Sequence, residues 1–131
     1  MKMNQEHLIP FSKQVKKLFE LLLPITGQSE YIFSSSIHQE KPMSSASVNV
    51  ALKRMQNGKY HGRMVAHGFR SMASTILNEN KFRGDVIEKQ LAHQERNKVR
   101  GAYNHAQYLE ERTDMMQWYA NYLDKLKNQS D

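Results

Sequence analysis

Residues 66–79 read AHGFRSMASTILNE, and this stretch decides the expected fold. Its apolar side chains recur at helical spacing, at Phe69, Met72, Ala73, Ile76 and Leu77. A stripe of this kind predicts an amphipathic helix that packs one face into a core. His67 and Arg70 lie on the opposite face, three residues apart, so their side chains are expected to be neighbours. The stretch therefore predicts a helix with a core on one side and candidate functional residues on the other.

The residues before this helix predict two more helices. Ser12 is expected to begin one whose apolar face repeats every three to four residues, and Pro24 and Gly27 are expected to end it. The second is expected to open at Ser44 or Ser45 and to stop before residue 59.

Two short segments predict β structure. The first ten residues lack helical spacing and end in Leu8-Ile9-Pro10, which favours a strand or a hairpin arm. Residues 31–33, Tyr-Ile-Phe, are typical of a short buried strand or an extended piece. The fold class is therefore expected to be mainly α with a small N-terminal β element, an α+β chain.

The downstream part predicts three further helices. Asp85 is expected to cap a short one, another is expected over about 98–109, and Thr113 is expected to cap an amphipathic C-terminal helix over 113–127. The apolar face of this last helix carries Met115, Trp118, Tyr119, Tyr122, Leu123 and Leu126. That face is expected to pack onto the chain's own core, with docking on a neighbouring copy as the alternative.

Composition excludes several classes of protein. The 131 residues suffice for one domain with a core, and the absence of cysteine excludes a disulfide framework and cysteine-based zinc sites. No run of eighteen apolar residues predicts a membrane span, and the first residues lack the apolar region of a secretory signal. We therefore expect no membrane-spanning segment. The basic balance by itself allows nucleic acid or an anionic membrane surface as the polyanionic partner, and of the two we expect nucleic acid and no membrane.

The basic surplus is concentrated in one stretch. Lys and Arg number 19 against 13 Asp and Glu, a net charge of +6. Residues 41–78 contain no acidic residue and hold the following cations: Lys41, Lys53, Arg54, Lys59, Arg63 and Arg70. A long acid-free stretch predicts a surface that faces phosphates, as in DNA binding. The alternative is an ordinary solvated basic surface.

Four segments carry candidate reactive groups, and each has an ordinary explanation when taken singly. Lys2 fits an exposed terminal lysine, and His67 fits a helix N-cap or a surface histidine. His93, at the end of Leu91-Ala92-His93, fits a cation at a helix C-terminus. Tyr103 shares a stripe with alanine and valine and fits a core tyrosine.

A histidine metal site is the remaining chemical alternative. The candidate ligands would be His61, His67, His93 and His105. No H-E-x-x-H pattern or carboxylate cluster accompanies them. We therefore expect neither a metal nor another cofactor.

The order of these segments is far more specific than any one of them. The series begins with Lys2 and continues with H-x-x-R at His67 and Arg70, L-A-H ending at His93, and Tyr103. This order resembles the catalytic domain of the tyrosine recombinases, the phage integrase family. The resemblance is strongest to integrases of satellite phages and genomic islands. It includes the stretches HLIPFS at 7–12, ALKRM at 51–55, VIEKQLAH at 86–93 and VRGAYN at 99–104, and runs from residue 2 to about residue 126.

The resemblance implies a role for each residue of the set. Tyr103 would attack a DNA phosphate and form a 3′-phosphotyrosyl link, while Arg70 would hold the non-bridging oxygens. His67 and His93 would hydrogen-bond the same phosphate and assist proton movement around the tyrosine. Lys2 would protonate the leaving 5′-oxygen. Because phosphoryl transfer depends mainly on positioning and charge, such a set needs no metal.

The resemblance also implies what surrounds this chemistry. Residues 1–131 would be the C-terminal part of an integrase catalytic domain, with the family's other catalytic arginine and the N-terminal DNA-binding domains absent, so weak or no cleavage is expected from this chain alone. The implied partners are double-stranded DNA at attachment sites and, in the full-length protein, copies of itself in a tetramer, within the bacterial cytoplasm at the nucleoid. The alternatives are a non-catalytic DNA-binding remnant and a basic helical protein with an unrelated partner.

Overall fold

The computed structural model describes residues 7–92 and 108–129 and divides the chain into two compact units. We call Val15–Met72 the inner unit, and Met1–Gln14 together with Ala73–Asp131 the outer unit. The chain thus leaves the outer unit after residue 14 and returns to it at residue 73.

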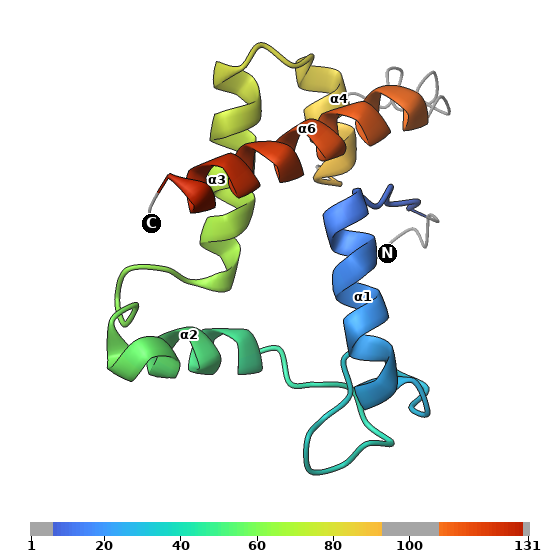
Figure 1. Ribbon diagram of the computed structural model, residues 1–131, viewed down its shortest axis with the longest axis vertical. Coiled ribbons are helices and arrows are strands. Elements are labelled where there is room, and N and C mark those ends of the chain that lie inside the picture. The colour runs from blue at the N-terminus through green and yellow to red at the C-terminus, as the bar shows by residue number, and fades with distance from the viewer. Residues whose placement is uncertain (1–6, 93–107, 130–131) are drawn as a thin grey trace, which may run out of the picture. The chain divides into compact units, whose positions relative to one another are not determined.

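The regular structure of the described residues is helical. The helices are α1 Lys13–Thr26, α2 Ser47–Gly58, α3 Ala66–Glu79, α4 Gly84–Gln90 and α6 Leu109–Asn128 (Figure 1). Each corresponds to a helix predicted from the sequence, so the mainly α expectation is confirmed. The helix predicted over about 98–109 falls almost entirely outside the described residues.

The predicted start of α1 is confirmed, whereas its predicted end is only partly right. The helix begins at Lys13, directly after the buried Ser12. Pro24 does not end it but lies inside its last turn. Proline weakens a helix by removing one donor and crowding the preceding turn, yet two more residues follow before the helix stops. Gly27 marks the boundary, and its backbone N–H donates to the Leu23 carbonyl at 2.8 Å.

Helix α2 begins slightly later than predicted. Its first residue is Ser47, with Ala46 at the N-cap, and Ser44 instead accepts a hydrogen bond from the Ala46 backbone N–H at 3.3 Å. Near its end, Gln56 and Asn57 adopt left-handed backbone conformations with φ of 47° and 56°. The predicted stop before residue 59 is therefore confirmed.

Two predicted helix caps are wrong. Helix α6 begins at Leu109, and the Thr113 hydroxyl, four residues further on, donates to the Leu109 carbonyl at 2.6 Å. A threonine hydroxyl that donates a hydrogen bond to the carbonyl four residues earlier satisfies that carbonyl and does not cap a backbone N–H. Helix α4 likewise begins at Gly84 after Arg83, so Asp85 lies within the first turn instead of at the cap. There its carboxylate still suits the positive end of the helix dipole.

The predicted β structure is not found in the described residues. Residues 7–10 form no strand, and the Leu8 carbonyl is instead satisfied by the side chain of Arg112. The buried strand predicted at 31–33 is wrong, because these residues form a bend and a turn with exposed side chains. Only a single antiparallel bridge pairs Ser34 with Pro42 in this part of the chain.

The main core lies in the outer unit, where α4 contacts α6 (Figure 1). Its buried side chains come from α3, α4 and α6: Leu77, Val86, Ile87, Met115 and Tyr119. Trp118 closes one side, with its ring 5.0 Å from that of Phe82 and 5.3 Å from that of Tyr122. The two amphipathic stripes predicted from the sequence therefore meet in one core.

The ends of those stripes are exposed rather than buried. Phe69 at the start of α3 is 44% exposed, and Leu123 and Leu126 near the end of α6 are 37% and 43% exposed. Only the second half of the α3 stripe and the first half of the α6 stripe enter the core. The amphipathic pattern thus identifies the buried face but not how far along each helix it is covered.

The inner unit has a much smaller core. Among its residues only Leu52 of α2 is a buried apolar side chain. Phe19 of α1 and Phe33 contact each other with ring centroids 6.1 Å apart. Two backbone hydrogen bonds, from Met43 to Phe33 and from Ser35 to Lys41, tie the loop between α1 and α2. This unit carries most of the candidate functional residues.

Candidate nucleic-acid interface

The cations of the acid-free stretch all lie in the inner unit. Lys53 and Arg54 belong to α2, and Arg70 belongs to α3. The three others lie in loops: Lys41, Lys59 and Arg63. Within the described residues none of the six forms an ion pair. Their charge is therefore not neutralised by the described part of the chain and is available to an anionic partner.

His67 and Arg70 lie near the start of α3, one turn apart. His67 is exposed and Arg70 is half-buried. His67 is the second residue of the helix, so the N-cap alternative for it is wrong. Their spacing of three residues places the imidazole and the guanidinium on one face, as predicted. Two nitrogen-bearing side chains are thus brought together at a helix N-terminus, where the backbone also favours anions.

Close packing fixes the start of α3 against α2. The Asn49 side chain of α2 accepts a hydrogen bond from the Ala66 backbone N–H at 2.7 Å. It thereby satisfies one of the N–H groups that a helix start leaves unpaired. A Cβ at Gly68 would lie only 2.7 Å from the Met64 sulfur, so a larger residue there would displace that side chain. Sequence reasoning missed Asn49, because its partner lies seventeen residues further on.

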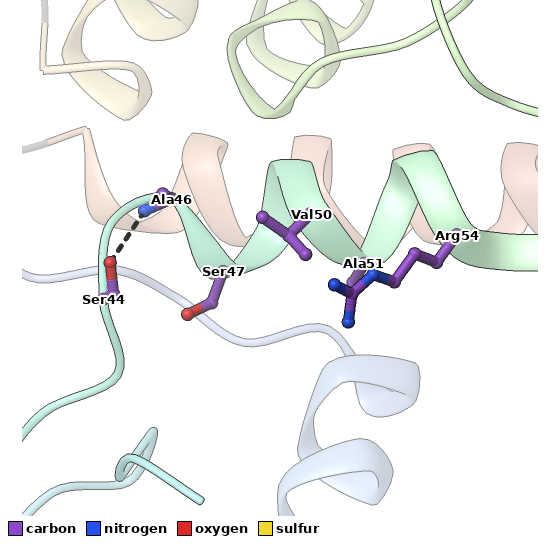
Figure 2. A pocket seen from close by; sticks show the side chains of 6 residues that line it. All are labelled: Ser44, Ala46, Ser47, Val50, Ala51 and Arg54. Carbon is purple, nitrogen blue, oxygen red and sulfur yellow. Dashed lines mark hydrogen bonds between the residues drawn. The ribbon is translucent and has the colours of Figure 1, made fainter. Parts of the chain in front are cut away.

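Arg54 lines a shallow depression on α2. The other lining residues are Ser44, Ala46, Ser47, Val50 and Ala51. Figure 2 shows the Arg54 side chain running back along α2, so that its guanidinium lies next to Ala51. The Ser47 hydroxyl lies one turn nearer the helix start (Figure 2). Helical side chains point toward the N-terminus, which brings this cation closer to the positive end of the helix.

The other members of the predicted catalytic set, Lys2, His93 and Tyr103, lie outside the described residues. Of the set, the described part of the chain thus contains only His67 and Arg70, which it brings together on α3.

Three tyrosines follow Tyr103 in the sequence, and all three lie in the described residues of the outer unit. Tyr119 is 9% exposed, and burial followed by the neighbouring Tyr122 raises its pKa. Tyr122 stacks on Trp118. Tyr108 is half-buried, with the Arg83 guanidinium 5.2 Å from its ring centre. Each is held in packing or stacking contacts within the outer unit.

A fully buried arginine was missed by the sequence analysis. Arg112 of α6 is 0% exposed, and burial lowers the pKa of its guanidinium. Its Nε donates to the Gln90 Oε1 at 2.8 Å, and its Nη2 donates to the Leu8 carbonyl. Because arginine is almost always exposed, the sequence analysis did not consider Arg112 as a buried residue. A charged residue inside an apolar stripe, three positions before Met115, is the only available hint.

In residues 7–92 and 108–129 no three His, Asp or Glu side chains are grouped closely enough to hold a metal ion. None of the helices in those same ranges combines the length and apolarity needed to cross a membrane.

Comparisons with known proteins identify the family. The phage integrase family profile matches residues 1–110. The chain is 50% identical over 121 residues to the prophage integrase IntA of Escherichia coli K12, covering 92% of this chain and 29% of that protein. It is 43% identical over 130 residues to the integrase of Enterobacteria phage P4, covering 98% of this chain and 29% of the relative. The integrase of Shigella phage Sf6 is 43% identical over 126 residues, covering 95% of this chain and 32% of the relative.

The chain therefore spans about 30% of the length of these relatives. No solved structure matches it significantly. With the family profile covering most of the sequence and the three relatives each covering more than nine-tenths of it, the chain belongs to the phage integrase family.

Proposed function

We propose that the protein carrying this chain is a tyrosine-type site-specific recombinase that integrates or excises a mobile element. The observation that carries the proposal is the position of His67 and Arg70, one turn apart at the start of α3, within an acid-free stretch of a phage integrase sequence. The fixed fork of Arg70 suits a phosphate that gains charge in the transition state, and His67 beside it can donate a second hydrogen bond.

The reaction also requires the three residues outside the described ranges. In this proposal Tyr103 attacks a DNA phosphate, so that a phosphotyrosyl bond forms as the bond to the 5′-oxygen breaks. His93 assists proton movement at the same phosphate. Lys2, on a short N-terminal β element, gives its proton to the leaving 5′-oxygen. A tyrosine with an ordinary pKa of about 10 needs such cations before it is a useful nucleophile at neutral pH.

The remaining cations would bind the DNA backbone. Lys53 and Arg54 are consecutive residues of α2, and the Arg54 side chain points toward the start of this helix (Figure 2). Lys41, Lys59 and Arg63 lie in the loops on either side of α2. We propose that these five contact phosphates of double-stranded DNA, with copies of the full-length protein assembling as a tetramer at attachment sites in the bacterial nucleoid.

A covalent-trapping assay tests the chemistry. The chain itself is incubated with nicked duplexes tiled across the DNA that flanks its gene. A chimera, in which the chain replaces the matching 29% of the phage P4 integrase, is assayed on nicked duplexes of P4 DNA. The expected result is a denaturant-resistant protein–DNA band from the chimera that Tyr103→Phe abolishes and Tyr108→Phe retains. Arg70→Lys is expected to slow its formation by about 10²–10³-fold.

The same assay separates the proposal from its alternative. No band from either protein, together with DNA binding that weakens as salt rises, would support the non-catalytic DNA-binding remnant. For the backbone contacts, Lys53→Ala is expected to reduce the slope of log K against log salt by about 0.9, whereas Lys127→Ala near the end of α6 leaves the slope unchanged. Equal slopes for the two variants would contradict the proposed interface.

A further inference from the structure

The outer unit contains a buried polar junction centred on Arg112. Its guanidinium is fully shielded from solvent and donates to the Gln90 side chain and to the Leu8 carbonyl. The His7 ring nitrogen lies 3.4 Å from the Gln90 carbonyl and forms a second link between the same segments. Removing a charged group from water costs several kcal/mol, so a buried guanidinium is tolerated only where its acceptors are held in place.

The junction joins three segments that are distant in sequence. Arg112 is separated from Gln90 by 22 residues and from Leu8 by 104. Chain continuity therefore does not bring these groups together, and the hydrogen bonds define how the segments fit. Gln90 is the last residue of α4, and Arg112 lies in the first turn of α6.

Each of these segments leads directly to a residue of the proposed catalytic set. Leu8 follows Lys2 by six residues, Gln90 precedes His93 by three, and Arg112 follows Tyr103 by nine. Arg112, the one buried cation of the described residues, thus joins the described segments that flank Lys2, His93 and Tyr103. A site assembled from separate segments needs such support, because a misplacement of about 1 Å can cost roughly 10²-fold in rate.

We propose that Arg112 is a positioning residue for DNA cleavage: it fixes the segments that flank Lys2, His93 and Tyr103 through its bonds to Leu8 and Gln90. This inference rests on the proposed recombinase function. Arg112 itself touches no substrate in this scheme. Its loss is therefore expected to slow the covalent step while leaving DNA affinity, which depends on the cations of the inner unit, unchanged.

The decisive experiment measures both quantities in the chimera used for the trapping assay. Arg112→Met is expected to lower the rate of adduct formation at saturating DNA by about 10²-fold and to leave Kd within about twofold. Arg83→Met is the matched control, because it removes an exposed arginine of the same unit that contacts Glu111 and Tyr108. Its adduct rate is expected to equal that of the wild type.

A second pair of variants covers the case in which Arg112→Met fails to fold. Gln90→Leu removes one acceptor of the guanidinium, whereas Gln90→Glu keeps an oxygen at that position. The first is expected to slow adduct formation and the second to restore it, with circular dichroism showing equal helix content. Wild-type rates in Gln90→Leu and in folded Arg112→Met would overturn the positioning role alone. An absence of adduct from the wild-type chimera would overturn the proposed function and this inference together.

Discussion

Tyr119 combines burial with a hydroxyl group that can ionise. It lies in the core formed by α3, α4 and α6 and is 9% exposed. Burial, and then the neighbouring Tyr122, raise the pKa of its phenol above the ordinary value. The native state therefore keeps the Tyr119 proton at a pH at which the unfolded chain has already lost it.

This difference predicts a specific loss of stability at alkaline pH. Because the folded pKa is the higher one, the stabilisation is complete below the unfolded pKa of about 10 and is lost as the pH rises from there through the folded value. Tyr119→Phe removes the ionisable group and should flatten this decline. Urea unfolding between pH 8 and 11 measures it, and an equally steep decline in the variant would contradict the role assigned to Tyr119.

Helices α4 and α6 are linked at the surface as well as through the core. Arg83, directly before α4, forms an ion pair with Glu111 in the first turn of α6 at 2.7 Å. The side chains are 57% and 47% exposed, so solvent screens most of the attraction. Their coupling in a double-mutant cycle of Arg83→Met and Glu111→Gln is expected to be about 0.2–1 kcal/mol and to shrink in 1 M salt. A coupling that does not change with salt would show that packing, rather than charge, links these residues.

The existence and type of the helices could be predicted from the sequence, whereas their ends could be predicted only in part, as at the start of α1 and the end of α2. Apolar spacing reports which face of a helix is buried, and this was right for α3 and α6. Helix ends depend on individual backbone hydrogen bonds. A side chain such as that of Thr113 can either accept from a backbone N–H at a helix start or donate to a carbonyl within the helix, as it does here. The strand predicted before Pro10 required a second strand to pair with, whereas in the structure the Leu8 carbonyl accepts a hydrogen bond from the Arg112 side chain.

The candidate site could be predicted only where its residues are close in sequence. His67 and Arg70 lie one turn apart, so their pairing follows from helical geometry. Asn49 and Arg112 act on partners 17 and 104 residues away. No local pattern carries that information, and only the fold reveals it.

The two units of the molecule differ in how much apolar surface they bury. Among the described residues of the outer unit, five buried apolar side chains form the core, whereas Leu52 is the one buried apolar side chain of the inner unit. Local opening is easiest where few apolar contacts must be broken. Hydrogen exchange followed by mass spectrometry is therefore expected to label α2 faster than α4 and the first half of α6. Protection of α2 equal to that of α4 would contradict this ranking.

The division of the outer unit into two stretches of sequence also has a consequence during translation. The Val15–Met72 segment emerges from the ribosome complete before Arg112 is made, so the Leu8 carbonyl lacks this partner until α6 has been synthesised. Closing a loop of that length carries an entropic cost of roughly 3–4 kcal/mol, which only the late contacts of α6 offset. A product truncated before α6 therefore lacks the side chain that satisfies the Leu8 carbonyl. Helix α6, the last of the described helices, thus secures the first of the described residues.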